Sequence, residues 1–296
     1  MPCLPVPPSR ALALCLSVSA LLLPLAASAQ SWGASAAINA TAVLNLPGQP
    51  PQAITKVDNF SFNGQPQALL PTTLGQLSTV SNGGTASAQF QGSIGTLKAY
   101  SYAAFPYGYD AQGFGLFTGY ASATAQGSFA DAIVVTGAGL AAGTPVSYRV
   151  DFSIDGTLSS PSFEIGGFLS ASANATTRLT DLQSGQQVSF NWDASQQSTG
   201  LYSLTLATQV GHTLQFVGLL NTSAGVTHYA QLGRSAEADF FHTARYALAP
   251  SVAGLNTVGA SGHDFAVSSV PEPSNWALFG AGLMALTWLK SRRTRA

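Results

Sequence analysis

Histidine and aspartate side chains are the groups of this chain that could act as general bases or metal ligands, so their spacing is the first evidence on its chemistry. The sequence contains four histidines, and no two of them are separated by two or four residues: His212, His228, His242 and His263. His263 is followed by Asp264, but the glycines around this pair predict a loop. These spacings do not favour a metal site or a catalytic dyad.

Two aspartates, Asp151 and Asp155, lie four residues apart in a segment of alternating polar and apolar residues. The alternation places both carboxylates on one face of a strand, but their spacing matches no calcium-binding loop. We expect them to be solvated on an outer face, beside Arg149. The sequence also lacks the motifs of serine hydrolases, zinc proteases and phosphate-binding loops, and a dinucleotide-binding fingerprint in a strand–helix setting. It therefore predicts a protein that is not an enzyme and has no cofactor or metal, with a secreted hydrolase as an alternative.

One aromatic cluster has the composition of a ligand-binding surface, and it consists of Tyr100, Tyr102, Phe105, Tyr107 and Tyr109. The run Phe-Pro-Tyr-Gly-Tyr at 105–109 is typical of a loop. Exposed tyrosines can stack on sugars or contact proteins, which makes Tyr102, Tyr107 and Tyr109 candidates for contact with an exopolysaccharide. We nevertheless expect at least half of the cluster to pack in the core.

The chain is poor in charge. Only 8% of its 296 residues are charged, and its formal net charge is −1, whereas about 25% of the residues of an average soluble domain are charged. Because the basic surface of a nucleic-acid binder is missing, that class of partner is excluded. Between residues 30 and 269 there are six basic and eleven acidic residues, a net charge of −5. A mildly acidic middle that is rich in Ser, Thr, Asn and Gln is typical of a secreted protein.

The N-terminal segment has the features of an export signal. Arg10 precedes the apolar run 11–25, and the small residues Ala27 and Ala29 form a cleavage pattern for signal peptidase. We expect residues 1–29 to be removed, so that the mature chain begins at Gln30. A retained membrane anchor is the alternative, although the run is short for a span. Both cysteines of the chain, Cys3 and Cys15, lie in this segment, so the mature protein has neither disulfides nor thiolate ligands.

The C-terminal segment has three parts. Residues 269–275 contain Val270, Pro271, Glu272 and Pro273, and the prolines keep this stretch extended. Residues 276–289 are apolar, and as a helix they would be about 21 Å long, against a hydrocarbon core of about 30 Å. Tryptophans at both ends of this run suit the membrane interfaces, and the last residues, 290–296, form a basic tail that the positive-inside rule places in the cytoplasm. The anchor residues are Trp276, Trp288, Lys290, Arg292, Arg293 and Arg295. The alternative is a buried helix of a soluble domain.

This order of parts resembles the PEP-CTERM sorting signal of Gram-negative bacteria, a region that family catalogues also name an ice-binding protein C-terminal domain. The resemblance implies processing near Val270–Pro273 by an exosortase, a membrane transpeptidase, with Glu272 as the side chain that is read between the prolines. It further implies a protein that is first anchored in the inner membrane with its ectodomain outside, and that then reaches the cell surface or the extracellular matrix.

The middle of the chain has the two-residue period of β-strands. Residues 146–154 alternate without a fault and are followed by Asp155-Gly156, a pair typical of turns. Residues 188–192, 202–206 and 210–216 alternate in the same way, which places His212 on the apolar face of a strand as a hydrogen-bonded core or edge residue. Strands at this spacing predict an all-β fold, an antiparallel β-sandwich. A β-solenoid is the alternative, but no repeat of fixed length occurs.

The sequence thus predicts a β-rich ectodomain over 30–268, with an irregular N-terminal part at 30–84, between a signal helix and one C-terminal transmembrane helix. We expect an exported surface or matrix protein whose partners are signal peptidase, an exosortase, the membrane and an exopolysaccharide. The alternative function is that of a surface module that binds a polysaccharide or ice. Ice binding is disfavoured because no regular threonine array repeats.

Overall fold

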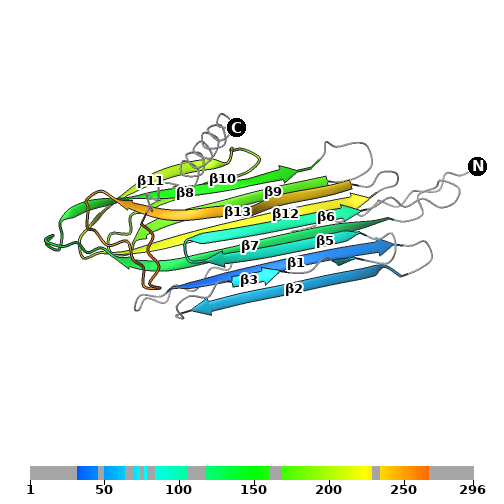
Figure 1. Ribbon diagram of the computed structural model, residues 1–296, viewed down its shortest axis with the longest axis horizontal. Helices are drawn as coiled ribbons and strands as arrows, with labels where there is room; N and C mark the ends of the chain where they lie inside the picture. The colour runs from blue at the N-terminus through cyan, green and yellow to red at the C-terminus, as the bar shows by residue number, and fades with distance from the viewer. Residues whose placement is uncertain are drawn as a thin grey trace, which may run out of the picture.

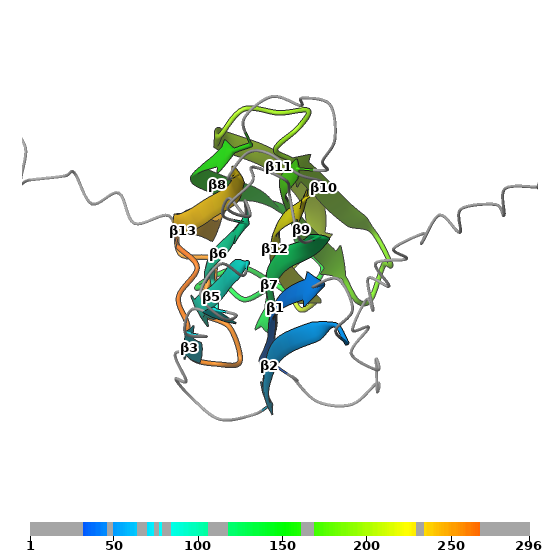
Figure 2. The ribbon, with the colours of Figure 1, turned by 90° about the vertical axis from the view of Figure 1, so that its right-hand side faces the viewer.

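The computed structural model describes residues 32–45, 50–63, 70–73, 77–78, 84–105, 118–160, 169–228 and 234–266. In these ranges the chain forms thirteen strands and no helix. The strands make two antiparallel sheets that lie face to face as a long sandwich (Figure 1; Figure 2). The predicted all-β antiparallel sandwich is confirmed, in place of the β-solenoid. The expected signal helix and transmembrane helix lie outside the described residues.

The first sheet has six strands, and the longest of them, β12 and β7, lie side by side at its centre. Its order is β10 (Gln187–Asp193), β9 (Leu169–Asp181), β12 (Thr213–His228), β7 (Thr118–Val134), β1 (Gly33–Asn45) and β2 (Gln52–Asn63). Among the described residues, no helix has the length and hydropathy to cross a bilayer.

The second sheet covers the inner face of the first (Figure 2). Its order is β11 (Gly200–Gln209), β8 (Pro145–Ser159), β13 (Arg234–Pro250), β6 (Thr96–Phe105), β5 (Thr85–Ser93) and β3 (Leu70–Thr73), and the short β4 (Leu77–Ser78) also pairs with β5. In β5 and β6 every second residue is buried, which is the alternation that the sequence shows.

The core between the sheets combines small residues with large aromatic rings. On β7, Gly127 leaves room for the ring of Phe90, with which a Cβ at this position would clash. Gly218 on β12 does the same for Phe129. Such pairing of large and small side chains gives dense packing, which must hold together a folded region whose described residues include no cysteine.

The turn that the sequence predicts at Asp155-Gly156 is wrong, because β8 continues through both residues to Ser159. Gly156 instead lies under Phe240, and a Cβ there would clash with that ring and with the backbone carbonyl of Asp239. The register of β13 against β8 shifts between Asp239 and Thr243, at the same level. The glycine therefore serves close packing beside an irregularity of the neighbouring strand.

The strand predicted over 210–216 begins later than expected. Val210 and Gly211 form the turn between β11 and β12, and Gly211 has a φ of 96°, which favours glycine. β12 begins at Thr213, so His212 belongs to the turn rather than to a strand face.

A C-terminal strap, residues 251–266, follows β13 and closes one end of the sandwich (Figure 1). Its backbone bonds tie it to the first sheet, with Ala260 N donating to Ala132 O at 2.8 Å. The side chain of Phe265 is buried in the core and contacts Phe216 with ring centroids 5.0 Å apart. The strap is therefore part of the folded domain.

Candidate functional site

The tyrosines of the aromatic cluster lie on the outer face of the second sheet. Tyr100 and Tyr102 alternate on β6 with buried residues, and both are partly exposed. Their neighbours on β13 are acidic, since Tyr100 pairs with Asp239 and Tyr102 with Glu237. On the other side, Tyr100 pairs with Gln89 of β5. We call these five residues the tyrosine face.

The rest of the cluster is distributed differently. Phe105 ends β6 and is buried in the core, as two-residue alternation from Tyr100 requires. Tyr107 and Tyr109 lie outside the described residues. Of the three candidate contact residues, the structure therefore places Tyr102 on an outer surface. The acidic partners on β13 were missed, because pairing between β6 and β13 leaves no local signal in the sequence.

The electrostatics of the tyrosine face favour hydrogen bonding to neutral ligands. Burial raises the pKa of Tyr100, and a hydrogen bond to Glu237 together with the negative charge of Glu237 and Asp239 raises this pKa further. The phenol therefore stays protonated, donates its hydrogen to Glu237 and can accept a hydrogen bond from a ligand. Two aromatic rings beside two carboxylates and an amide can stack on a sugar ring and accept bonds from its hydroxyl groups.

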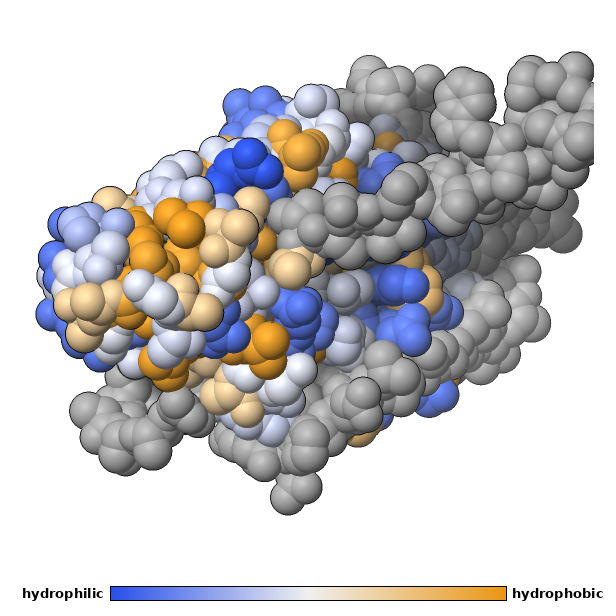
Figure 3. All heavy atoms as spheres, turned by 60° about the vertical axis from the view of Figure 1, so that its left-hand side comes forward, coloured by the Kyte–Doolittle hydropathy of each residue, from blue (hydrophilic) through white to orange (hydrophobic). Residues whose placement is uncertain are grey.

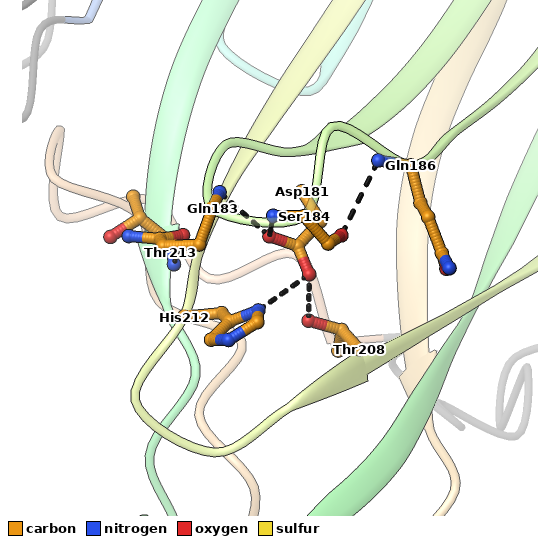
Figure 4. Close-up of polar contacts among 7 residues, drawn as sticks. All are labelled: Asp181, Gln183, Ser184, Gln186, Thr208, His212 and Thr213. Carbon is orange, nitrogen blue, oxygen red and sulfur yellow. Dashed lines mark hydrogen bonds and ion pairs between the residues drawn. The ribbon is translucent and has the colours of Figure 1, made fainter. Parts of the chain in front are cut away.

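A second polar cluster surrounds Asp181, the last residue of β9 (Figure 4). Its carboxylate accepts hydrogen bonds from Thr208 Oγ1 at 2.8 Å and from the backbone nitrogens of Gln183 and Ser184 at 2.9 and 3.1 Å. Nδ1 of His212 lies 2.7 Å from the same carboxylate. Asp181 is fully buried, so its charge depends on these partners.

The hydrogen bonds determine the charge state of Asp181. Burial by itself would raise the pKa of this carboxyl, but the bonds from His212, Thr208 and the turn backbone lower it well below its usual range. Thr208 donates to Asp181 rather than to His212, so the three side chains are not arranged as nucleophile and base. The cluster joins the turn after β9 in one sheet to the end of β11 in the other.

A third cluster holds the C-terminal strap. Asp131 of β7 is fully buried, and its carboxylate accepts bonds from Ser261 Oγ at 2.5 Å and from Ala132 N at 2.8 Å. Burial raises the pKa of Asp131, while the donors from Ser261 and Ala132 oppose this shift. Gly259 lies so close that any Cβ there would clash with the carboxylate.

The pair His263-Asp264 lies in the strap, and its side chains have different partners. The ring of His263 lies over Gly95 and contacts Phe265 edge-on, with ring centroids 4.7 Å apart. Asp264 accepts a hydrogen bond from Thr257 Oγ1 at 2.6 Å. Burial lowers the pKa of His263, against the charges of Asp131 and Asp264. Both side chains thus contribute to the structure of the strap.

The prediction that Asp151 and Asp155 of β8 are both solvated is wrong for Asp151. Asp151 is buried on the outer face, whereas Asp155 is exposed. The guanidinium of Arg149 binds both oxygens of Asp151, at 2.9 and 2.8 Å, and Ser203 Oγ of β11 donates to it at 2.6 Å. The contact from Ser203 comes from the neighbouring strand β11, so the spacing of residues along β8 could not predict it.

The residues of both termini lie outside the described part of the chain: the cleavage pattern at Ala27, Ala29 and Gln30, the motif Val270–Pro273, and the anchor from Trp276 to Arg295. Within the described ranges, no three His, Cys, Asp or Glu side chains lie together as metal ligands could.

The comparison with known families concerns this C-terminal part. A family model of the PEP-CTERM protein-sorting motif matches residues 269–293. No curated protein and no solved structure matches the chain. The match supports a PEP-CTERM protein, which an exosortase-type enzyme directs to the cell surface, and it lends no support to the ice-binding name.

Proposed function

Because the chain carries a PEP-CTERM protein-sorting motif, we propose that it is a non-enzymatic protein of the cell surface or extracellular matrix. Its signal segment 1–29 directs export, and its apolar run 276–289 holds it in the inner membrane with the ectodomain outside. An exosortase then cuts near Val270–Pro273 and releases the ectodomain to the surface.

The observation that carries this proposal is the position of the matched motif directly after the folded domain. Phe265 is buried in the core, and the match begins at residue 269. The two fully buried carboxylates, Asp131 and Asp181, hold the strap and two turns through their hydrogen bonds. Their use in structure supports a role for the ectodomain that needs no catalysis.

We expect the mature protein to end upstream of Trp276 in cells that contain the sorting enzyme, and to keep Ala296 in cells that lack it. Mass spectrometry of the C-terminal peptide distinguishes these ends. A chain in which Pro271 and Pro273 are both replaced by alanine should keep the tail in either strain, because the extended substrate conformation is weakened. An intact Ala296 in both strains would contradict the processing step.

A second function, binding of an exopolysaccharide, is favoured by the tyrosine face. Tyr100 and Tyr102 stand two residues apart on one outer face, beside Glu237 and Asp239. This combination of rings and acceptors offers stacking and hydrogen bonds to a neutral sugar polymer. A released ectodomain with such a face would remain in the matrix by binding its polysaccharide.

Replacing Tyr100 and Tyr102 by alanine should therefore weaken retention on the exopolysaccharide of the producing cells. A lost aromatic contact of about 0.5–1.5 kcal/mol per ring corresponds to roughly a two- to tenfold rise in Kd for each. Pull-down of the purified ectodomain with the polymer measures this change. Tyr120→Ala is the matched control, since Tyr120 is a partly exposed residue on the outer face of the other sheet. Equal retention of all variants would contradict this function.

A further inference from the structure

In the part of the chain that the structure describes, the end of the sandwich that the strap closes has few charged groups: the exposed carboxylate of Asp264 in the strap, and the buried carboxylates of Asp131 and Asp181. Five connections meet there, and none of them contains Lys, Arg, Asp or Glu: 94–95, 135–144, 182–186, 210–212 and 251–262. We call them the charge-free end. The outer face of the second sheet differs, since seven charged residues lie on it: Lys98, Arg149, Asp151, Asp155, Glu237, Asp239 and Arg245.

Apolar side chains project from the charge-free end. Val252, Val258 and Leu182 are exposed by 42%, 43% and 50%. Figure 3 views the molecule with this end forward and shows apolar residues in orange on it, among hydrophilic residues in blue and residues of intermediate hydropathy. Such a surface brings one exposed carboxylate, that of Asp264, near a bilayer, and this carboxylate already accepts hydrogen bonds from Thr257 Oγ1 and Ala266 N.

The chain leaves the folded domain at this same end. Ala266 forms a bridge with Leu248, two residues before β13 ends at Pro250. The backbone carbonyl of Phe265 accepts a bond from Leu248 N at 2.7 Å, which fixes the point of exit. The strap thus delivers the C-terminal segment from the charge-free end.

The distance to the expected anchor is short. Nine residues, 267–275, lie between Ala266 and Trp276, and the ten steps from one Cα to the other reach at most about 35 Å when fully extended. β8 alone has 15 residues, which span about 50 Å along the sandwich. The segment is therefore too short for the domain to stand upright on its opposite end.

We propose that the charge-free end rests on the lipid surface around the anchor for as long as the C-terminal segment is intact. This proposal depends on the proposed function, because it needs the anchor at 276–289. The domain then stands on its end, with the tips of Val252, Val258 and Leu182 at the headgroup level. Both outer sheet faces, including the tyrosine face, point sideways into the periplasmic space and stay accessible.

Site-specific fluorescence quenching tests this orientation. Because the chain after residue 29 has no cysteine, Val252→Cys provides a single labelling site. The chain with an intact C-terminal segment is labelled with an environment-sensitive dye and inserted into vesicles that contain headgroup-nitroxide lipids. We expect a loss of fluorescence for the dye at position 252 and none for Ser159→Cys, an exposed residue at the far end of β8.

Two further carboxylates at this end should abolish the contact. Introducing Leu182→Asp and Val258→Asp into the Val252→Cys chain should restore the fluorescence, while Leu201→Asp, at a more exposed residue of β11, should leave the quenching unchanged. Flotation of the vesicles identifies which idea fails. If the chain does not float with them, the anchor and the orientation are both overturned. If it floats and the dyes at 252 and 159 behave alike, the orientation alone is overturned.

Discussion

Asp181→Ala is expected to lower the free energy of unfolding by about 3–5 kcal/mol at pH 7, since breaking a buried charged pair leaves its partners unsatisfied. The substitution removes the acceptor for Thr208, His212 and the turn backbone at once. The turn after β9 and the turn that leads from β11 to β12 lose their common partner. Urea unfolding of the ectodomain, followed by tryptophan fluorescence, measures the change.

The same residue predicts a dependence on pH. The hydrogen bonds lower the pKa of Asp181 in the folded state, whereas an unfolded aspartate has a pKa of about 3.9. Its contribution is therefore complete above the unfolded value and is lost as the pH falls below it toward the folded value. We expect the difference between wild type and Asp181→Ala to shrink below about pH 4. A difference that stays constant down to pH 2 would contradict this account.

Two substitutions serve as controls for Asp181. Asp155→Ala removes an exposed carboxylate of β8 and should change stability by less than about 0.5 kcal/mol. Asp181→Asn keeps an acceptor for the backbone nitrogens of the turn but carries no charge, so it should be less damaging than alanine and should lack the acid-dependent loss.

Phe265→Ala is expected to cost about 3–5 kcal/mol, the usual range for removing a buried phenylalanine ring. The ring is fully enclosed and packs against Phe129 and Phe216, with centroids 6.1 and 5.0 Å away. The backbone carbonyl of the same residue accepts a hydrogen bond from Leu248 N, and the buried ring holds this carbonyl in place. Its removal should therefore weaken the core and loosen the strap.

Hydrogen exchange separates these two effects. In Phe265→Ala, the amides of Phe265 and Ala260, which are bonded to Thr257 O and Ala132 O, should lose more protection than those of β7. Phe60→Ala is the matched control, because Phe60 on β2 is partly exposed. Uniform loss of protection across the sandwich, or an unchanged free energy of unfolding, would contradict the claim that the ring of Phe265 holds the strap to the core.

The local pattern predicted much of this fold. The alternation at 146–154 and 188–192 lies within β8 and β10, because a side chain that faces the core recurs at every second residue whatever its partner strand is. The sequence prediction was wrong where residues of another strand determine the local structure. Gly156 resembles a turn residue but makes room for Phe240, and Gly211 lies in the turn that leads from β11 in one sheet to β12 in the other, where the alternation of the sequence continues.

The residues that meet in the candidate sites were harder to predict from the sequence than the strands were. Asp181 lies 27 residues from Thr208 and 31 from His212, and Asp131 lies 130 residues from Ser261. Tyr102 could be singled out from the sequence, but Glu237 could not, although the two residues face each other across paired strands. No period or spacing relates such residues, because strand order determines which of them meet.

The sequence by itself determined the PEP-CTERM sorting motif, the scarcity of charge and the all-β class, because each is written in neighbouring residues or in composition. Only the tertiary structure decided that the strap belongs to the core, that buried aspartates bind it and the turns, and that five connections without Lys, Arg, Asp or Glu meet at one end. These features arise where distant strands are brought into register. Their free energy comes from burial and hydrogen bonds that form only after the two sheets pack.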